Sequence, residues 1–245
     1  MASGIVAAMV AEARILAKGP IAPGEFILLP QGAMLLLSGI GANRARVAAQ
    51  ALMEKGATAL VSWGSAGGLM PALSPGRLIL PERILAADQS VYPVDPIWHE
   101  RLYSRLKGYV DPHRGVLAQS TVVLATPSEK AALFRRAGAV AVDMESASIA
   151  QVAKEAGMPF IAIRVIADGA EMNIPRGGLD FIDEFGRVRL LGLLSFIIRY
   201  PVELFALVRM GRNFRAAETT LAKVALRAGS CLLCPYAQDD GRRRE

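Results

Sequence analysis

The feature that most constrains the fold is a layout that repeats along the first 170 residues. Short apolar runs typical of buried β-strands each end in glycine or small polar residues, and amphipathic helical stretches separate them. Such alternation predicts a mostly parallel sheet with helices on both faces. Ligands of open α/β sheets bind outside the carboxyl ends of the strands. We therefore expect the residues that follow the runs to share one crevice.

The pattern places the elements as follows. The expected strands are Ile5–Met9, Met34–Leu37, Ala59–Ser62, Arg77–Leu80, Gly115–Leu117, Ala139–Val142 and Phe160–Ile166. The expected helices are Val10–Leu16, Asn43–Glu54, Pro96–Leu106, Ser128–Ala137 and Ser146–Ala156, with a last helix near Ala216–Ala228.

Length and composition indicate one α/β domain with ample core. The chain has 245 residues, of which 53% are hydrophobic, and a mean hydropathy of +0.34 that is high for a soluble protein. We expect a domain over residues 1–229, including an apolar insertion at 185–215, and a polar tail at 230–245. No apolar run is long enough to span a bilayer, and the start lacks the basic region of a secretory signal, so the expected compartment is the cytoplasm.

Charge and cysteines exclude some classes of function. The net charge of +6 is not combined with stacking aromatics, which make up only 6% of the residues, so we expect no nucleic-acid partner. Cys231 and Cys234 form a single C-x-x-C without a second ligand pair. They predict neither a zinc site nor a redox motif.

The tetrad Val142-Asp143-Met144-Glu145 is the most informative cluster. It stands where the run Ala139–Val142 ends and an alanine-rich helix begins. A fixed carboxylate there can accept hydrogen bonds from two hydroxyls of a sugar, and the methionine supplies a soft apolar wall. Alone, the tetrad is explained as well by an acid that the dipole of the following helix favours.

Four further clusters follow apolar runs in the same way. They are Gly4–Met9 with Glu12 three residues on, Ser38–Gly41, Gly64–Leu69 and Arg164–Ala170. With the tetrad, these motifs in this order resemble the nucleoside phosphorylase and nucleosidase family, above all its 5′-methylthioadenosine/S-adenosylhomocysteine nucleosidase branch. The resemblance implies a single-domain, three-layer α/β/α phosphorylase-like fold with a mixed, mostly parallel central sheet.

The resemblance also implies catalytic roles for two residues. The family cleaves an N-glycosidic bond, and Asp168 matches the acid that serves N7 of the leaving purine. That role needs a raised pKa or a proton shared with the base, because an ordinary aspartate is ionised at pH 7. Glu12 matches the glutamate that orients the attacking water. Without the resemblance, Asp168 would be interpreted as a turn or cap residue. Glu12 would be interpreted as an exposed residue of the first helix.

Further residues are expected to bind the substrate. Glu145 matches the residue that holds the ribose hydroxyls, and Met144 the one that packs on the sugar. The small residues Ser65, Ala66 and Gly67, and likewise Ser38, Gly39 and Gly41, would form loops whose amides approach a ribose or phosphate oxygen, and Val123 and Leu124 would border the purine. No metal or cofactor is implied, and inorganic phosphate is the one conceivable co-substrate.

The chain departs from the family pattern at three places. The usual Glu-Met-Glu has Asp143 at its first position, the usual serine before the catalytic aspartate is Ala167, and Trp63 stands where a polar residue is frequent. A phosphate pocket is therefore not evident. Arg44 could bind phosphate, but a solvated helix residue explains it equally well.

The segment at 173–214 is longer and more apolar than in the smaller nucleosidases. Two apolar stretches, Leu190–Ile198 and Val202–Val208, are separated by Pro201, which should break them into two short helices. Arginines bracket them at positions 187, 189, 199, 209, 212 and 215. An interfacial membrane hairpin is one interpretation, and extra core helices or a subunit interface are the other.

This insertion carries the substrate expectation, because a soluble nucleoside gives no reason for it. Ser38–Arg46, Val142–Ser146 and Pro201–Arg215 resemble the hopanoid-associated phosphorylases. That resemblance implies release of adenine from lipid-linked adenosylhopane in hopanoid biosynthesis, at the inner face of the cytoplasmic membrane, and it favours phosphate over water as the nucleophile. A soluble methylthioadenosine/adenosylhomocysteine or futalosine-type nucleosidase is the alternative enzyme, and a membrane-associated nucleoside-binding module is the non-enzymatic alternative. A homo-oligomer, a dimer, is expected.

Overall fold

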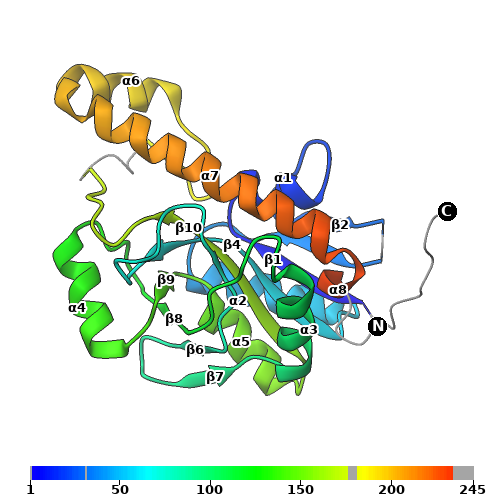
Figure 1. The fold of residues 1–245 in the computed structure, drawn as a ribbon. Coiled ribbons are helices and arrows are strands. Elements are labelled where there is room, and N and C mark those ends of the chain that lie inside the picture. The colour runs from blue at the N-terminus through cyan, green and yellow to red at the C-terminus, as the bar shows by residue number, and fades with distance from the viewer. Residues whose placement is uncertain (1, 31, 176–180, 234–245) are drawn as a thin grey trace.

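The computed structural model describes residues 2–30, 32–175 and 181–233, and its centre is a mixed sheet of ten strands (Figure 1). The strands are β1 (Ser3–Ala7), β2 (Phe26–Leu28), β3 (Met34–Leu37), β4 (Ala59–Gly68), β5 (Leu78–Ile79), β6 (Arg83–Leu85), β7 (Val91–Pro93), β8 (Val116–Gln119), β9 (Ala141–Asp143) and β10 (Phe160–Asp168). Their order is β2-β3-β1-β4-β9-β8-β6-β7, and β10 pairs with β4 and β5.

Parallel pairs dominate the sheet. β1 pairs in parallel with β3 and β4, β4 with β10, and β8 with β6 and β9. The antiparallel pairs are β2–β3, β4–β9, β5–β10 and β6–β7. The predicted mixed, mostly parallel sheet is therefore confirmed.

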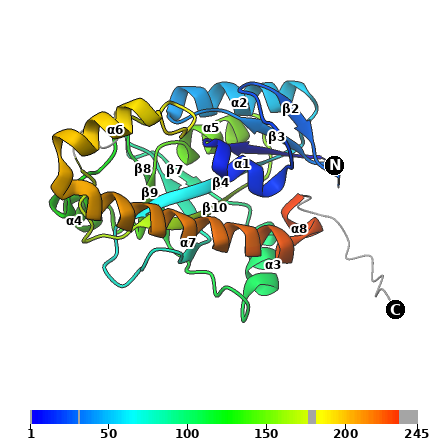
Figure 2. The same ribbon diagram turned by 90° about the horizontal axis from the view of Figure 1, so that it is seen from above.

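Helices cover both faces of the sheet. They are α1 (Val10–Leu16), α2 (Ala42–Glu54), α3 (Pro96–Leu106), α4 (Pro127–Ala137), α5 (Ser146–Glu155), α6 (Leu190–Arg199), the 3₁₀ turn η1 (Pro201–Glu203), α7 (Leu204–Ala228) and α8 (Ser230–Leu233). α2 packs with α5 on one face, and α7 packs with α1 and α3 on the other (Figure 2). These are the three layers that the sequence predicts.

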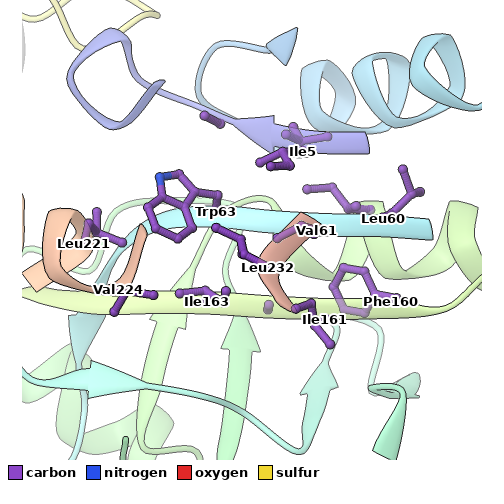
Figure 3. Packing of buried hydrophobic residues seen from close by; sticks show 14 of the residues in the cluster. Ile5, Leu60, Val61, Trp63, Phe160, Ile161, Ile163, Leu221, Val224 and Leu232 are labelled. Atoms are coloured by element: carbon purple, nitrogen blue, oxygen red, sulfur yellow. The ribbon is translucent and has the colours of Figure 1, made fainter. Parts of the chain in front are cut away.

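The core lies between the central strands and α7. Figure 3 shows Trp63 of β4 and Ile163 of β10 grouped with Leu221 and Val224 of α7. The indole N–H of Trp63 donates to the backbone oxygen of Glu12 over 3.2 Å. This buried bond ties the start of α1 to β4, so the departure of Trp63 from the family pattern has a structural role.

Strand β4 is longer than the sequence suggests. We expected a strand to Ser62 followed by a loop of small residues, but β4 continues to Gly68 because Gly64–Gly67 pair with Arg164–Asp168 of β10. Ser65, Ala66 and Gly67 therefore lie on a strand, and the expectation of a loop there is wrong. The short strands β2, β6 and β7 carry no run that the sequence pattern singled out.

The C-terminal region has the predicted break but not the predicted second helix. α6 ends at Arg199 and η1 begins at Pro201, yet α7 then runs 25 residues without interruption into the last helix. α6 and the start of α7 project from the body, and the end of α7 lies on it (Figure 1). We call α6, η1 and Leu204–Val208 of α7 the apolar hairpin.

The hairpin is sharply bent. α6 and the stretch Pro201–Ala228 meet at 113°, and they have the length and composition of a membrane span only when taken together. Within the described residues, no single helix is both long enough and apolar enough to cross a membrane.

The beginning of the expected polar tail is part of the core. Cys231 and Leu232 of α8 are buried, and the indole N–H of Trp98 donates to the Cys231 carbonyl over 2.6 Å. Cys234 and the rest of the expected tail lie outside the described residues.

Candidate active site

A cavity of about 390 Å³ opens at the carboxyl ends of β4, β9 and β10. Most of the residues expected to form a site line it: Glu12, Ser65, Ala66, Gly67, Val123, Leu124, Met144, Glu145 and Asp168. They come from three strands or strand ends, one helix and one loop. The prediction that strand ends converge on one crevice therefore agrees with the structure.

Glu12 is buried at the start of α1, with 1% of its surface exposed. Its Oε1 accepts hydrogen bonds from the backbone N of Ser65 at 2.7 Å and the Ser65 hydroxyl at 2.8 Å, and its Oε2 accepts one from the Met9 N–H at 3.1 Å. Burial raises the pKa of Glu12, while Arg164 and the bonds from Ser65 lower it. An exposed helix residue is thus the wrong interpretation of Glu12.

Glu145 follows β9 and is also buried. Its Oε1 accepts from the Gly41 N–H at 2.8 Å, and its Oε2 from the Met144 N–H at 3.3 Å. Burial and the neighbouring Asp143 raise the pKa of Glu145 to about 7, against the opposing effect of Arg164 and Gly41. This carboxyl group therefore titrates near neutral pH and is held with defined geometry.

Arg164 of β10 connects the acidic residues, and the sequence reasoning did not select it. Its Nε donates to Asp143 Oδ2 at 2.8 Å, and its Nη2 donates to the Ser62 hydroxyl at 2.6 Å and lies 3.9 Å from Glu145 Oε2. Burial lowers the pKa of Arg164, but its carboxylate neighbours raise it further, so the guanidinium stays charged. The available signal was an arginine inside the apolar run Phe160–Ile166.

Gly64 makes the approach of Glu12 and Arg164 possible. A Cβ at this position would lie 2.5 Å from Arg164 Nη1 and 2.6 Å from Glu12 Oε2, and φ is +155°. A larger residue would push both charged groups out of place.

Asp168 forms an ion pair with Lys130 of α4, which the sequence reasoning also missed. Lys130 Nζ donates to Asp168 Oδ2, to the Gly169 carbonyl at 2.8 Å and to the Met172 carbonyl at 3.2 Å. Burial raises the pKa of Asp168, and Lys130 opposes that effect. Lys130 is fully buried on the same helix face as Leu133, and this three-residue spacing was the available signal.

The Ser38–Gly41 turn supports the site from behind. Ile40 lines the cavity, whereas Gly41 acts through its bond to Glu145. The Ser38 hydroxyl donates to the carbonyls of Ala7 and Gly39. A Cβ at Gly39 would lie 2.9 Å from Arg44 Cδ and 3.1 Å from Phe185 Cε1. The amides of Ser38 and Gly41 are thus bonded within the protein, to the Ala7 carbonyl and to Glu145, and Ser38, Gly39 and Gly41 are not among the residues that line the cavity.

The insertion supplies the far wall of the cavity. Its residues there are mostly apolar: Ile182, Gly186, Val188, Met210, Gly211 and Phe214. The segment is fastened over the site, because Val10 N donates to the Phe185 carbonyl at 3.0 Å and Ile40 N to the Glu184 carbonyl at 2.7 Å. One end of the cavity is thus ionic and the other is apolar.

The cations of the cavity are already paired. Within the described residues, those that line it are Arg164 and Lys130, and each binds an aspartate. Arg44 lies outside, exposed and 4.0 Å from Glu184. No three histidine, cysteine or acidic side chains of the described chain are grouped as metal ligands.

Fold and site together define an enzyme of the nucleoside phosphorylase and nucleosidase class. The sequence matches the phosphorylase superfamily over residues 24–189, and the chain belongs to that family.

Named relatives lie in one branch. The 5′-methylthioadenosine/S-adenosylhomocysteine nucleosidase of Shewanella sp. (strain MR-7) is 28% identical over 178 residues, covering 63% of this chain and 75% of the relative. The enzyme of the same name from Buchnera aphidicola subsp. Acyrthosiphon pisum (strain Tuc7) is 30% identical over 159 residues, covering 57% and 68%.

Solved structures show the same fold. The Neisseria meningitidis nucleosidase of that name, in complex with methylthio-immucillin-A, has a TM-score of 0.68 at 21% identity and covers 92% of this chain and 96% of its own. The futalosine hydrolase of Helicobacter pylori has a TM-score of 0.64 at 17% identity, with coverages of 91% and 96%.

Proposed function

We propose that the protein cleaves the N-glycosidic bond of an adenine nucleoside. The observation that carries this proposal is the meeting of Glu12, Glu145 and Asp168, from distant parts of the chain, around one cavity. The relatives named as adenosine-type nucleosidases support the choice of base.

Each carboxyl group has a separate task in this proposal. As the bond between ribose and adenine breaks, its electron pair goes to the base, and Asp168 gives N7 a proton. Glu145 accepts hydrogen bonds from the ribose hydroxyls, and Met144 packs on the sugar. Val123 and Leu124 border the base. Burial raises the pKa of Asp168, which is the direction that a proton donor requires.

Water is the better nucleophile for this geometry than phosphate. The amide and hydroxyl of Ser65, which could hold a phosphate, already bind Glu12. A phosphate would also meet the carboxyl oxygens of Glu12 and Glu145, while Arg164 is paired with Asp143. We therefore propose hydrolysis with Glu12 as the base, although the sequence resemblance favours phosphate.

The substrate we propose carries an apolar, lipid-like group, as in adenosylhopane. Val188, Met210 and Phe214 of the insertion line the cavity. The neighbouring hairpin exposes large apolar side chains, among them Leu191 at 84% and Phe205 at 83%. One element therefore joins the apolar end of the site to an apolar surface, which suits a nucleoside anchored in a bilayer.

The hairpin is accordingly proposed to bind the inner face of the cytoplasmic membrane peripherally. Its apolar side chains are flanked by exposed arginines at 187, 189, 199, 209, 212 and 215. Apolar burial and attraction to anionic lipids act together in such a surface. A dimer stays a prediction. The second candidate is a soluble 5′-methylthioadenosine/S-adenosylhomocysteine nucleosidase, favoured by the names of the relatives.

Product analysis separates these candidates. Purified protein is incubated with 5′-methylthioadenosine and, separately, with adenosylhopane in anionic vesicles, each with and without phosphate. We expect adenine from both substrates, a higher kcat/KM for the lipid, and a free ribosyl product whether or not phosphate is present. Cleavage of the soluble nucleoside alone would select the second candidate, and a ribose 1-phosphate product would replace water by phosphate.

The variant Glu12→Ala tests whether Glu12 activates water as the nucleophile. If Glu12 activates water, its loss should lower kcat by roughly 10²–10⁴-fold. A loss of only a few-fold, with the protein folded, would contradict hydrolysis assisted by Glu12.

A further inference from the structure

Lys130 is held in one position by the helix that carries it. α4 begins at Pro127 after a capping box, in which the Thr126 hydroxyl accepts from the Glu129 N–H at 3.3 Å and Glu129 Oε2 accepts from the Thr126 N–H at 2.9 Å. Lys130 follows on the inner side of the first turn with none of its surface exposed. The cap therefore sets the place at which the ammonium group enters the cavity wall.

The ammonium group has a complete set of acceptors. Its three N–H donors match three oxygens: Asp168 Oδ2 and the carbonyls of Gly169 and Met172. Both residues line the cavity, but Asp168 retains 19% side-chain exposure whereas the Lys130 side chain has none. A proton on Lys130 can thus reach the cavity through Asp168.

Other charged groups near this end of the cavity do not compete for the proton. Glu129, next to Lys130 on α4, is exposed and bound to the cap, and Glu171 after β10 is exposed. Glu12 and Glu145 accept hydrogen bonds from Ser65 and Gly41, and Arg164 is paired with Asp143. Lys130 and Asp168 therefore act as a pair.

We propose that Lys130 is a positioning residue that supplies, through Asp168, the proton that the departing adenine takes up. This inference rests on the proposed function. As the glycosidic bond breaks and its electron pair moves into the base, Asp168 passes a proton to N7 and Lys130 passes one to Asp168. The pair ends as a carboxylate and a neutral amine, and it regains the proton from solvent after the base leaves, while Glu12 releases to solvent the proton taken from water.

The pair explains how an aspartate beside a lysine can serve as an acid. One proton is shared between the two groups, so Asp168 need not take a proton from solvent before each turnover. Without the lysine, Asp168 could act only while it carries its own proton. Its activity would then fall as pH rises through the pKa of Asp168, whereas in the intact pair Lys130 supplies the proton.

The test compares two leaving groups in Lys130→Met. One substrate is 5′-methylthioadenosine, whose base needs a proton. The other is the 4-nitrophenyl riboside with the same 5′ group, whose leaving group needs none. We expect kcat for the adenine substrate to be within a few-fold of the wild type near pH 5 and to fall by roughly 10²-fold or more by about pH 9. For the nitrophenyl substrate, kcat should fall by no more than a few-fold at either pH.

Leu133→Ala is the matched control, because Leu133 lies one turn further along the same buried face of α4. A purely structural effect on α4 should lower kcat for both substrates by the same factor at every pH. Equal losses in Lys130→Met, or an unchanged pH profile, would overturn the inference. Wild-type protein that cleaves neither substrate would instead contradict the proposed function.

The wild type provides a second measurement if Lys130→Met does not fold. Its kcat for 5′-methylthioadenosine, divided by that for the nitrophenyl riboside, should stay level above the ordinary range of carboxyl pKa values. A ratio that falls with pH in the range of about 5 to 7 would show Asp168 acting alone.

Discussion

At the scale of residues, the site is an arrangement of buried charges that would be costly in isolation. Arg164 lies among Asp143, Glu145 and Glu12, so three acidic groups surround one guanidinium. Charges removed from water need partners and hydrogen bonds to persist. Acids outnumber cations at this end, and burial raises the pKa of both Glu12 and Glu145, that of Glu145 to about 7.

Glu145 should make both stability and ribose binding depend on pH. Its folded pKa of about 7 lies above the ordinary 4.5, so its stabilising contribution is complete below pH 4.5 and is lost as pH rises through 7. Glu145→Gln stays neutral and keeps an acceptor for Gly41. The melting temperature of this variant should therefore rise relative to the wild type between about pH 5 and pH 8, measured by thermal denaturation. A constant difference would contradict the raised pKa.

The same group predicts substrate selectivity. A buried carboxylate meant for a hydroxyl is left without a partner when that hydroxyl is missing. We expect 2′- and 3′-deoxynucleosides to be poor substrates of the wild type, with kcat/KM lower by at least about tenfold. Equal turnover of ribo- and deoxyribonucleosides would remove Glu145 from the ribose site.

Asp168→Asn should lower both activity and stability. The activity should fall by roughly 10²–10⁴-fold because the acid is lost. Lys130 would also remain fully buried without a counter-charge, and breaking such a pair costs roughly 3–5 kcal/mol. Thermal denaturation should show that adding Lys130→Met recovers part of that stability while the activity stays low. No loss of stability in the single variant would mean that the pair is not an ion pair in solution.

At the scale of elements, the apolar hairpin and the body-bound half of α7 differ in what they bury. Beyond Arg215, α7 buries Ala217, Leu221, Val224 and Ala228 against the core. α6 buries only Phe196, which contacts Phe181 and Tyr200 with ring centroids 5.6 and 5.2 Å apart. The hairpin thus has an internal aromatic contact, but most of its apolar surface is exposed.

The hairpin predicts a position-specific effect on membrane binding. Leu191→Asp combined with Phe205→Asp should release the protein from anionic vesicles in co-sedimentation, since both side chains are exposed by more than 80%. The control is Leu226→Asp, because Leu226 is 80% exposed at the other end of α7. It should leave binding within a few-fold. If the intact protein stays in the supernatant at low salt, the membrane proposal fails.

At the scale of the whole molecule, the net charge of +6 contributes a non-specific attraction to anionic surfaces. Each arginine near such a surface adds about 1 kcal/mol at moderate salt, and salt screens this contribution. Vesicle binding should therefore weaken, but not vanish, between about 0.05 and 0.5 M salt, because apolar burial by the hairpin remains. Binding abolished by salt would show that charge alone holds the protein there.

Much of the fold follows from local pattern. Apolar runs with turn residues at their ends identify the main strands, and the carboxyl-end rule places Glu145 and Asp168 at the same crevice. The strand pattern does not show that β4 continues through its glycines, because pairing with β10 and β9 keeps Gly64–Gly68 extended. The strand pattern also does not show that α7 is continuous. The end of the insertion and the expected last helix both belong to this one helix, Leu204–Ala228.

The chemistry of the site divides in the same way. The sequence alone determined which acids stand at strand ends, because apolar periodicity records which residues are buried. Only the tertiary structure decided which charges meet: Lys130 reaches Asp168 across 38 positions, and Ser65 reaches Glu12 across 53. Periodicity shows that a face is covered but not by what, since the partner of a buried charge is chosen by packing between elements that are distant in the chain.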